Sequence, residues 1–581
     1  TDKLGGIVGP FAQGPVGTPT RIVNENQLLN VFGQPYETDR QYETWLTASS
    51  YLSYGGQLNV VRADDKKLLN ATVGIATSVR IKSEDNYEEL GYDENPITDV
   101  TVCARNPGSW ANDLRIGIID SRADQTIGID TTGVSAFTAA VSDRSGTLVG
   151  SASTIEFAST ASITVGQEVI CDVAGVVAAG TTVLHVPGAG AAGIVTISNA
   201  SLSDVDLTTT FDFGETTFSA DPILVGYGIT QAVPADTIVS KTGVGAGKTE
   251  ELDGYFKGIV TEIGEGTAGV KVLSHVSSGG TETSRDYDSI YKFNSTTTVA
   301  IHTTGQATSY GSTAVTSVTD WFDSQKLEVS TATVGGVSTV TTIDWNTLAD
   351  PPTTSEYVAS RGGRFDEVHV VVIDAKGTVT GNAGTILEKH LNLSKAKDAE
   401  FSVGSPSWWR KYIATNSSNI FAGGEPVGVV TTGFSSGFTK VENGSWDTNA
   451  EGVVYDSIGN YNKILENGKD YGGISTITAT GALNSGLDDI ISGYTEFEND
   501  TSVNVDFLLM GSANGGIDHS RALATKLISV AELRKDAVAF ISPYRAAMIT
   551  DKPNQETEAV ITGSEKATEN VIDFFNPITS S

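Results

Sequence analysis

The chain contains few of the residues that mark several large classes of protein. It has 581 residues but only two cysteines, Cys103 and Cys171, which are too few for a disulfide framework and are interpreted as reduced core residues. No run of about 18 apolar residues occurs, so no membrane-spanning helix is expected. A basic and then apolar signal peptide is also missing from the start of the sequence.

Basic residues are scarce as well. Lys and Arg number 37 against 70 Asp and Glu, which gives a formal net charge of −33. Such a surface repels phosphate backbones, so we expect no direct binding of nucleic acid. The acidic excess favours solubility, and the alternative is that acidic patches meet basic patches on a partner protein.

Glycine, by contrast, is abundant. The chain has 63 glycines, and its apolar content of 39% is low for so long a sequence. This composition predicts many turns and short strands rather than long helices. The length predicts roughly three to five domains.

The clearest local pattern lies near the end of the chain. An apolar run over 505–510 predicts a buried strand, and a glycine-rich turn follows it. Leu523 and Leu527 recur at helical spacing, and a second apolar run over 537–541 predicts another strand. Together these signals predict a β-α-β unit with parallel strands.

The first 63 residues predict a small α/β package. Its expected elements are strands over 5–11, 20–23 and 58–63 and helices over 25–32 and 39–54. The package is too short to bury a full core by itself. We therefore expect it to pack with the β-α-β unit at 503–549.

The middle of the chain changes character twice. Residues 64–100 are polar and acidic and predict a mobile connection. Strands over 114–120 and 365–374 both end in Ile-Asp, so we expect them to pair around an insertion. Short alternating runs over 131–345 predict an all-β sandwich or barrel. Helices are expected over 385–395 and 455–467, and a short mixed segment over 487–494.

These segments predict an α+β multidomain fold with a nested layout. Both chain ends, 1–64 and 430–581, form an α/β core domain. A second, mixed α/β domain combines 65–135 with 300–429. Residues 136–299 form an inserted all-β sandwich or barrel module.

Two segments come close to catalytic motifs without satisfying them. Residues 242–249 include Lys248 and resemble a phosphate-binding loop, but Thr242 replaces the first glycine and no long helix is predicted afterwards. Residues 433–437 fit the G-x-S-x-G pattern around Ser435, but no convincing helix follows. We interpret the first as a glycine-rich turn and the second as a polar loop.

Histidines and acidic pairs give no stronger signal. The six histidines are His185, His275, His302, His369, His390 and His519, and no two stand at metal-ligand spacing. His369 and His390 are expected to be structural. His519 begins a predicted helix, where a positive charge is disfavoured, so we expect it to be neutral and hydrogen-bonded. Asp64 and Asp65 are interpreted as solvated surface. The sequence thus predicts no catalytic residue, no metal site and no cofactor.

An ordered set of segments resembles the tail sheath proteins of contractile phages, most of all those of T-even-related phages of cyanobacteria. The segments are GGIVGPFAQGPVGTPTRIVNENQLLNVFGQP at 5–35 and those at 42–63, 104–118, 365–377, 387–399 and 515–543. They cover about half of the chain and leave out the β-rich insertion, which is variable in such proteins. No single motif decides the resemblance, but the ordered set is specific.

The resemblance implies a structural protein. Sheath subunits stack around a rigid tail tube, and the assembled sheath contracts to drive the tube through the host envelope. The implied partners are other sheath subunits, the tube protein, and baseplate and tail terminator proteins. The implied location is the virion tail, after assembly in the host cytoplasm. Energy would be stored in subunit packing, so no enzyme activity is implied.

The resemblance also carries a departure from the family pattern. Family members have an N-terminal arm before the segment at 5–11 and a further domain after the one at 574–581. Both contribute contacts between neighbours, so we expect this sequence to be a piece of a helical homo-oligomer that is monomeric by itself. Two other functions stay open: a β-rich surface or adhesion protein, and the sheath of a bacteriocin or secretion-type injection system.

Overall fold

The computed structural model describes most of the chain. The described residues are 3–37, 39, 41–74, 76, 78–131, 137–138, 141–163, 167–185, 193–203, 205–214, 216–217, 223–233, 237–240, 249–278, 282–284, 291–302, 311–334, 337–360, 365–424, 457–513, 515–547 and 564–578.

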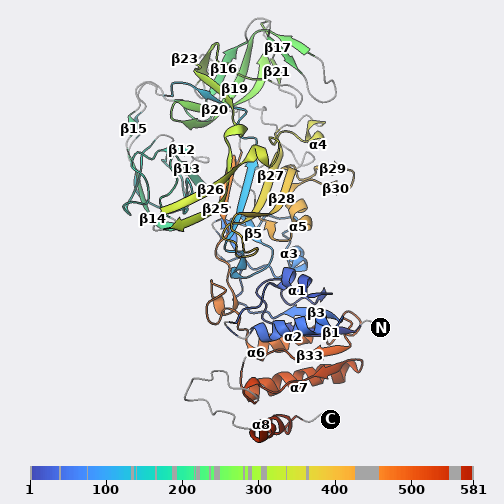
Figure 1. The fold of residues 1–581 in the computed structure, drawn as a ribbon. Coiled ribbons are helices and arrows are strands. Elements are labelled where there is room, and N and C mark those ends of the chain that lie inside the picture. Colours follow the sequence, from blue (N-terminus) through green and yellow to red (C-terminus); the bar gives the residue numbers. More distant parts are fainter. Residues whose placement is uncertain are drawn as a thin grey trace. The chain divides into compact units, whose positions relative to one another are not determined.

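The chain forms two compact units. The first contains Thr1–Asp113, Ser417–Gly423 and Leu465–Ser581, and the second contains Leu114–Asn416 and Gly424–Ile464. Both units mix helices with strands, and the described strands outnumber the helices and form several separate sheets (Figure 1). The expected α+β class with multiple sheets is therefore confirmed at this coarse level.

The first unit is built on a five-stranded sheet to which both chain ends contribute. Its order is β2 (Thr20–Ile22), β3 (Gln57–Arg62), β1 (Leu4–Gly9), β33 (Phe507–Leu509) and β34 (Val538–Phe540). β1 runs parallel to β3 and to β33, and β33 runs parallel to β34. The register confirms the β-α-β unit and its pairing with the start of the chain.

Helices pack on both faces of this sheet. They are α1 (Glu25–Phe32), α2 (Gln41–Ser53), α6 (Leu487–Thr495) and α7 (Ile517–Arg534). Ile7 of β1 packs with residues of α1 and α2 in one core cluster. Val8 points to the opposite face, since side chains alternate along a strand, and lies next to Gly493 of α6.

The strand at the edge of the sheet is less buried than its sequence suggests. Val538 is 57% exposed and Phe540 53% exposed, although both belong to the apolar run at 537–541. β34 pairs only with β33 among the described strands, so an edge position explains the exposure.

A second, three-stranded sheet in this unit lies where a mobile connection was expected. Its strands are β31 (Ile420–Ala422), β5 (Val100–Ala104) and β4 (Thr72–Gly74). The helix α3 (Glu84–Glu89) lies between β4 and β5 in sequence, and Ser83 Oγ caps it by accepting the Asn86 N–H at 3.2 Å. The stretch expected to be a mobile connection instead folds into β4 and α3, and the acidic side chains of α3 are exposed on this folded segment. The unit also holds η1 (Ser109–Ala111), η6 (Tyr471–Gly473), η7 (Arg545–Ala547) and α8 (Ser564–Phe575).

The second unit contains an antiparallel four-stranded sheet. Its order is β28 (Thr385–Ser394), β27 (Glu367–Asp374), β6 (Leu114–Asp120) and β32 (Asn460–Ile464). β27 is buried along its whole length and pairs with β6, from Val368 opposite Asp120 to Asp374 opposite Leu114. The predicted pairing of the two strands that end in Ile-Asp is confirmed.

Two helices expected in this unit are wrong, because both segments are strands of this sheet. β28 covers 385–394 of the first segment, and β32 covers 460–464 of the second, of which residues 457–467 are described. The buried strands β27 and β6 need hydrogen-bonding partners on both edges, and pairing overrides a weak helical preference. In β32, the buried residues Tyr461 and Lys463 alternate with less buried neighbours. This period of two residues is typical of a strand and was missed in the sequence.

Between β6 and β27 the described elements are almost entirely strands. A six-stranded sheet has the order β11 (Val169–Cys171), β14 (Leu207–Phe213), β9 (Val141–Leu148), β10 (Thr154–Phe157), β13 (Gly193–Ile197) and β12 (Val183–His185). An eight-stranded sheet has the order β23 (Gly311–Ala314), β22 (Thr298–His302), β16 (Gly228–Ala232), β19 (Tyr255–Gly264), β20 (Thr267–Val276), β7 (Gln125–Gly128) and β24 (Ser317–Asp320), with β21 (Glu282–Ser284) paired to β20.

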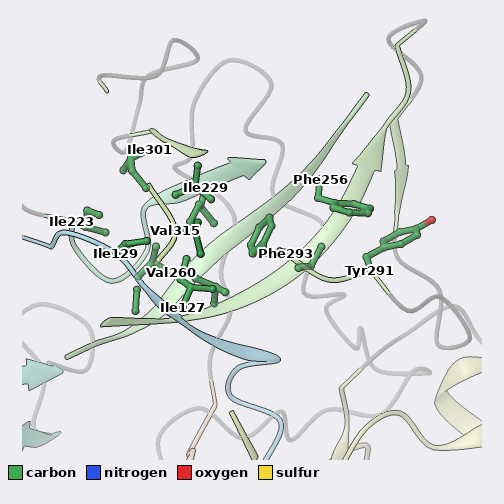
Figure 2. Packing of buried hydrophobic residues seen from close by; sticks show 14 of the residues in the cluster. Ile127, Ile129, Ile223, Ile229, Phe256, Val260, Tyr291, Phe293, Ile301 and Val315 are labelled. Carbon is green, nitrogen blue, oxygen red and sulfur yellow. The ribbon is translucent and has the colours of Figure 1, made fainter. Parts of the chain in front are cut away.

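Each of these two sheets has its own apolar core. Figure 2 shows the core of the eight-stranded sheet, where Ile127, Ile229, Phe256 and Ile301 extend from four different strands. The remaining described elements are β8 (Phe137–Thr138), β15 (Thr216–Thr217), β17 (Thr237–Ser240), β18 (Thr249–Leu252), β25 (Lys326–Val334), β26 (Val337–Asp344), β29 (Glu400–Ser402), β30 (Ser405–Pro406), η2 (Phe322–Ser324), η3 (Trp345–Thr347), α4 (Glu356–Ala359) and α5 (Trp409–Asn416).

Candidate functional site

The two catalytic-like motifs lie largely outside the described residues. Of the segment at 242–249 only Thr249 is described, and it begins β18. β18 pairs antiparallel with β17, so a strand follows the glycine-rich residues where a phosphate-binding loop requires a helix. Ser435 and its neighbours at 433–437 lie outside the described residues.

His369 is held inside the four-stranded sheet by both ring nitrogens. Its Nδ1 accepts the Asn392 N–H at 3.0 Å, and its Nε2 lies 2.8 Å from the Asp350 carbonyl oxygen. This pattern fits the neutral ring with its proton on Nε2. Burial lowers the pKa of His369 below its usual value, although the hydrogen bond to Asp350 acts in the opposite direction. The ring therefore has a structural role, as expected.

The other described histidines show no shared site. His390 lies in β28, with Nε2 2.9 Å from Glu388 Oε2 and its ring against Tyr412. His275 in β20 bonds the carbonyl oxygen of Asp253. His519 is exposed in the first turn of α7, and its expected hydrogen bond is not found among the described residues. His185 and His302 lie in β12 and β22, and their side chains are outside the described part.

The two cysteines lack the features of reactive thiols. Both are free thiols, Cys103 buried in β5 and Cys171 half-buried in β11. Burial raises the pKa of Cys103 to about 12, so almost no thiolate forms near neutral pH. Burial also raises the pKa of Cys171. Neither residue has the lowered pKa that a nucleophilic thiol needs.

The expected solvated pair Asp64 and Asp65 instead makes contacts within the first unit. Asp64 forms an ion pair with Arg80 and lies 3.6 Å from Lys82 Nζ. Asp65 accepts the Gly472 N–H at 2.6 Å. The two carboxylates therefore hold separate loops and are not paired as an acid and a base.

A buried polar cluster of the first unit surrounds Arg62 at the end of β3. Its fully buried guanidinium donates to the carbonyl oxygens of Phe11, Ala12, Gly14 and Pro107, at distances from 2.7 to 3.2 Å. One side chain thus provides hydrogen-bond donors for carbonyl oxygens of two irregular segments that are far apart in sequence. Such a buried cation is retained only where its donors are well matched.

Asp470 and Tyr471 complete this cluster. Asp470 is buried and accepts the N–H of Ser109 at 2.9 Å as well as the Ser109 hydroxyl. The hydroxyl of Tyr471 donates to the carbonyl oxygen of Ala63 at 3.0 Å, and its ring lies 5.9 Å from the Arg62 guanidinium carbon. Burial raises the pKa of both residues. The cluster connects four chain segments and offers no free nucleophile.

A second cluster lies at one end of the four-stranded sheet. Asp120 is fully buried, forms an ion pair with Lys395, and accepts the N–H groups of Ile458 at 2.9 Å and Gly459 at 2.8 Å. Every oxygen of this carboxylate is therefore occupied by a donor from the chain itself. The sequence reading missed Arg62 and Asp120, since a charged residue at the end of an apolar strand looks like a boundary with solvent.

Asp366 lies just before β27 and joins this sheet to α4. Its Oδ1 accepts the Ser355 N–H at 2.8 Å, and its Oδ2 accepts the hydroxyls of Ser355 at 2.8 Å and of Ser394. Burial raises the pKa of Asp366 to about 6, against the lowering effect of the serine hydrogen bonds. The group is a buried cap, since Ser355 in turn caps α4.

The described part of the chain contains neither a metal-binding group of side chains nor a membrane-spanning helix. No group of three or more His, Cys, Asp and Glu side chains there is placed to hold a metal ion. No helix there is long and apolar enough to cross a membrane. The polar groups described above therefore form buried clusters that connect chain segments.

Comparisons with known proteins give a consistent result. No family model matches the chain. Three curated relatives do, each named "Tail sheath protein": one of Salmonella phage ViI at 29% identity over 118 residues, one of Enterobacteria phage T4 at 34% over 73, and one of Vibrio phage KVP40 at 36% over 59. The matches cover 20%, 13% and 10% of this chain.

The same matches span 18%, 11% and 8% of the relatives' own lengths. The three relatives come from phages named for Salmonella, enterobacteria and Vibrio, so the expected likeness to phages of cyanobacteria stays a prediction. Over the matched segments, the chain is similar to the tail sheath proteins of contractile bacteriophages.

Proposed function

We propose that this chain is a structural subunit of a contractile tail sheath. In this role it surrounds the tail tube, and the assembled sheath contracts to drive the tube through the host envelope. The observation that carries the proposal is the similarity to three tail sheath proteins from different phages.

The architecture supports a mechanical role. The five-stranded sheet joins an early and a late part of the chain, and these two segments cannot separate without breaking β1 from β33. Arg62, Asp470 and Asp120 are used to connect segments, and each is saturated by donors or acceptors of the chain. Such bodies keep their shape while whole subunits shift against one another.

The proposed layout assigns parts to this role. Residues 1–64 with 430–581 form the core domain, and 65–135 with 300–429 form a middle domain. The module at 136–299 lies on the outside of the sheath. This division has its support in the change of composition along the sequence and in the strand-rich character of the described insertion.

The proposed partners follow from the same role. They are further copies of the chain, a tube protein, and baseplate and terminator proteins of a virion tail assembled in the host cytoplasm. Nucleic acid and membrane insertion play no part, and the protein is not an enzyme. ATP binding lost in Lys248→Ala, or hydrolase activity lost in Ser435→Ala, would overturn the last statement.

Electron microscopy tests the proposal. The full-length protein is purified and imaged alone and after mixing with tail tubes isolated from phage, and hollow cylinders with helical striations around the tubes are expected. The variant Arg62→Met, which disrupts the buried cluster at the end of β3, is the control and should coat fewer tubes. Tubes that stay bare with folded wild-type protein would contradict the proposed role.

A further inference from the structure

The edge strand of the four-stranded sheet carries a lysine whose side chain reaches another sheet. Lys463 in β32 pairs with Ile116 of β6, and only 4% of its side chain is exposed. Its Nζ donates to Thr154 Oγ1 at 2.8 Å and lies 3.9 Å from Glu156 Oε1. Both acceptors belong to β10 of the six-stranded sheet. A buried cation from one sheet therefore ends on a strand of another.

The two faces of β10 make different contacts. Ile155 and Phe157 are 0% and 2% exposed and belong to the apolar core of the six-stranded sheet. Since side chains alternate along a strand, Thr154 and Glu156 project from the opposite face. That face is the one Lys463 contacts, so the contact is separate from the packing that holds the six-stranded sheet together.

This contact is largely shielded from water, since the side chains of Lys463 and Glu156 are 4% and 17% exposed. Burial raises the pKa of Glu156, Lys463 lowers it, and Asp206 raises it again. A buried lysine needs acceptors in a defined direction, because an ammonium group out of water is stable only when hydrogen-bonded. Thr154 and Glu156 supply such acceptors from a fixed strand, so the contact has a preferred geometry.

We propose that Lys463 is a positioning residue that fixes the orientation of the six-stranded sheet relative to the four-stranded sheet. Through this contact the six-stranded sheet moves together with the four-stranded sheet. The inference rests on the contacts within the second unit and is independent of the proposed sheath role.

Distance measurements between spin labels test the proposal. Cys103 and Cys171 are replaced by serine, and labels are placed at Leu202→Cys and Val379→Cys, which are 62% and 41% exposed. Leu202 follows β13 of the six-stranded sheet, and Val379 lies in the connection between β27 and β28. With Lys463 present, we expect a single narrow distance distribution. Lys463→Met should broaden it or shift it, while circular dichroism stays unchanged.

Two further variants separate orientation from stability. Lys389→Met removes an exposed lysine from β28 of the same sheet and should leave the distribution narrow. Lys463→Arg keeps the cation and should restore most of the narrow distribution. A distribution in Lys463→Met that matches the wild type would overturn the proposal.

A milder change keeps the test decisive if Lys463→Met does not fold. Thr154→Val combined with Glu156→Gln removes the hydroxyl acceptor of Thr154 and the negative charge of Glu156. It leaves the core residues Ile155 and Phe157 in place. The distribution should broaden here too. An unchanged distribution in the folded double variant would equally overturn the proposal.

Discussion

Asp366→Asn is expected to change how the stability of the second unit depends on pH. The carboxyl is 1% exposed, and burial raises its pKa from 3.8 to about 6. Two pKa units correspond to about 3 kcal/mol of differential stability. Because the folded-state pKa is raised, this contribution is fully present below the unfolded pKa of 3.8 and is lost as the pH rises through about 6.

The substitution removes the charge and keeps the hydrogen-bonding geometry. An asparagine oxygen can still accept the Ser355 N–H, and its amide can donate to the hydroxyl oxygens of Ser355 and Ser394. The variant therefore should not lose stability on going from pH 4 to pH 8 through this group. Relative to the wild type, it should gain about 3 kcal/mol over that interval.

Urea denaturation at several pH values between 4 and 8, followed by tryptophan fluorescence, measures the difference. Trp345 is a suitable reporter, since it is buried in the second unit. Asp323→Asn, at an exposed position of the same unit, is the matched control and should run parallel to the wild type. If the Asp366→Asn curve is parallel too, the carboxyl is not destabilised by burial and the reasoning fails.

Three further changes test other parts of the structure. Arg62→Met leaves four carbonyl oxygens without their donor, so urea denaturation should show a loss of at least about 3 kcal/mol; a loss below about 1 kcal/mol would contradict the cluster. Gly493→Ala would place Cβ 2.5 Å from Val8 Cγ1 and should cost about 1–3 kcal/mol in a thermal melt, whereas Gly516→Ala, with nothing within 4 Å, should be nearly neutral. Iodoacetamide at pH 7.5 should leave Cys103 unmodified until urea unfolds the protein, and rapid labelling in the native state would refute its burial.

The sequence predicts those elements whose signal is local. The β-α-β unit has apolar runs, a glycine-rich turn and helical spacing within some forty residues, and each part agrees with β33, α7 and β34. The same holds for α1, which Asn24 caps by accepting the Gln27 N–H. Patterns of this kind are decided by neighbours in the chain and so can be read without the fold.

Elements decided by distant partners could not be predicted in the same way. β28 and β32 contain residues that suit a helix, yet both pair with strands more than ten residues away or on the far side of the insertion. The buried charges behave similarly. In the sequence, Asp120 has the pattern of a polar residue at the end of a strand. In the fold it is bound by Lys395 and Gly459, which are distant in sequence. Their role is a property of the folded chain and has no local signal.

The use of buried cations follows from the scarcity of basic residues. The chain has 37 Lys and Arg against 70 Asp and Glu, so basic side chains are the scarcer partners for buried ion pairs. Arg62, Arg115, Lys395 and Lys463 are each at most 4% exposed, and each contacts a segment from another part of its own unit. A buried ion pair adds little net stability over an apolar pair, but it tolerates few alternative geometries. The three ion-paired cations, Arg115, Lys395 and Lys463, therefore act mainly on which arrangement of sheets the chain adopts, and less on how stable that arrangement is.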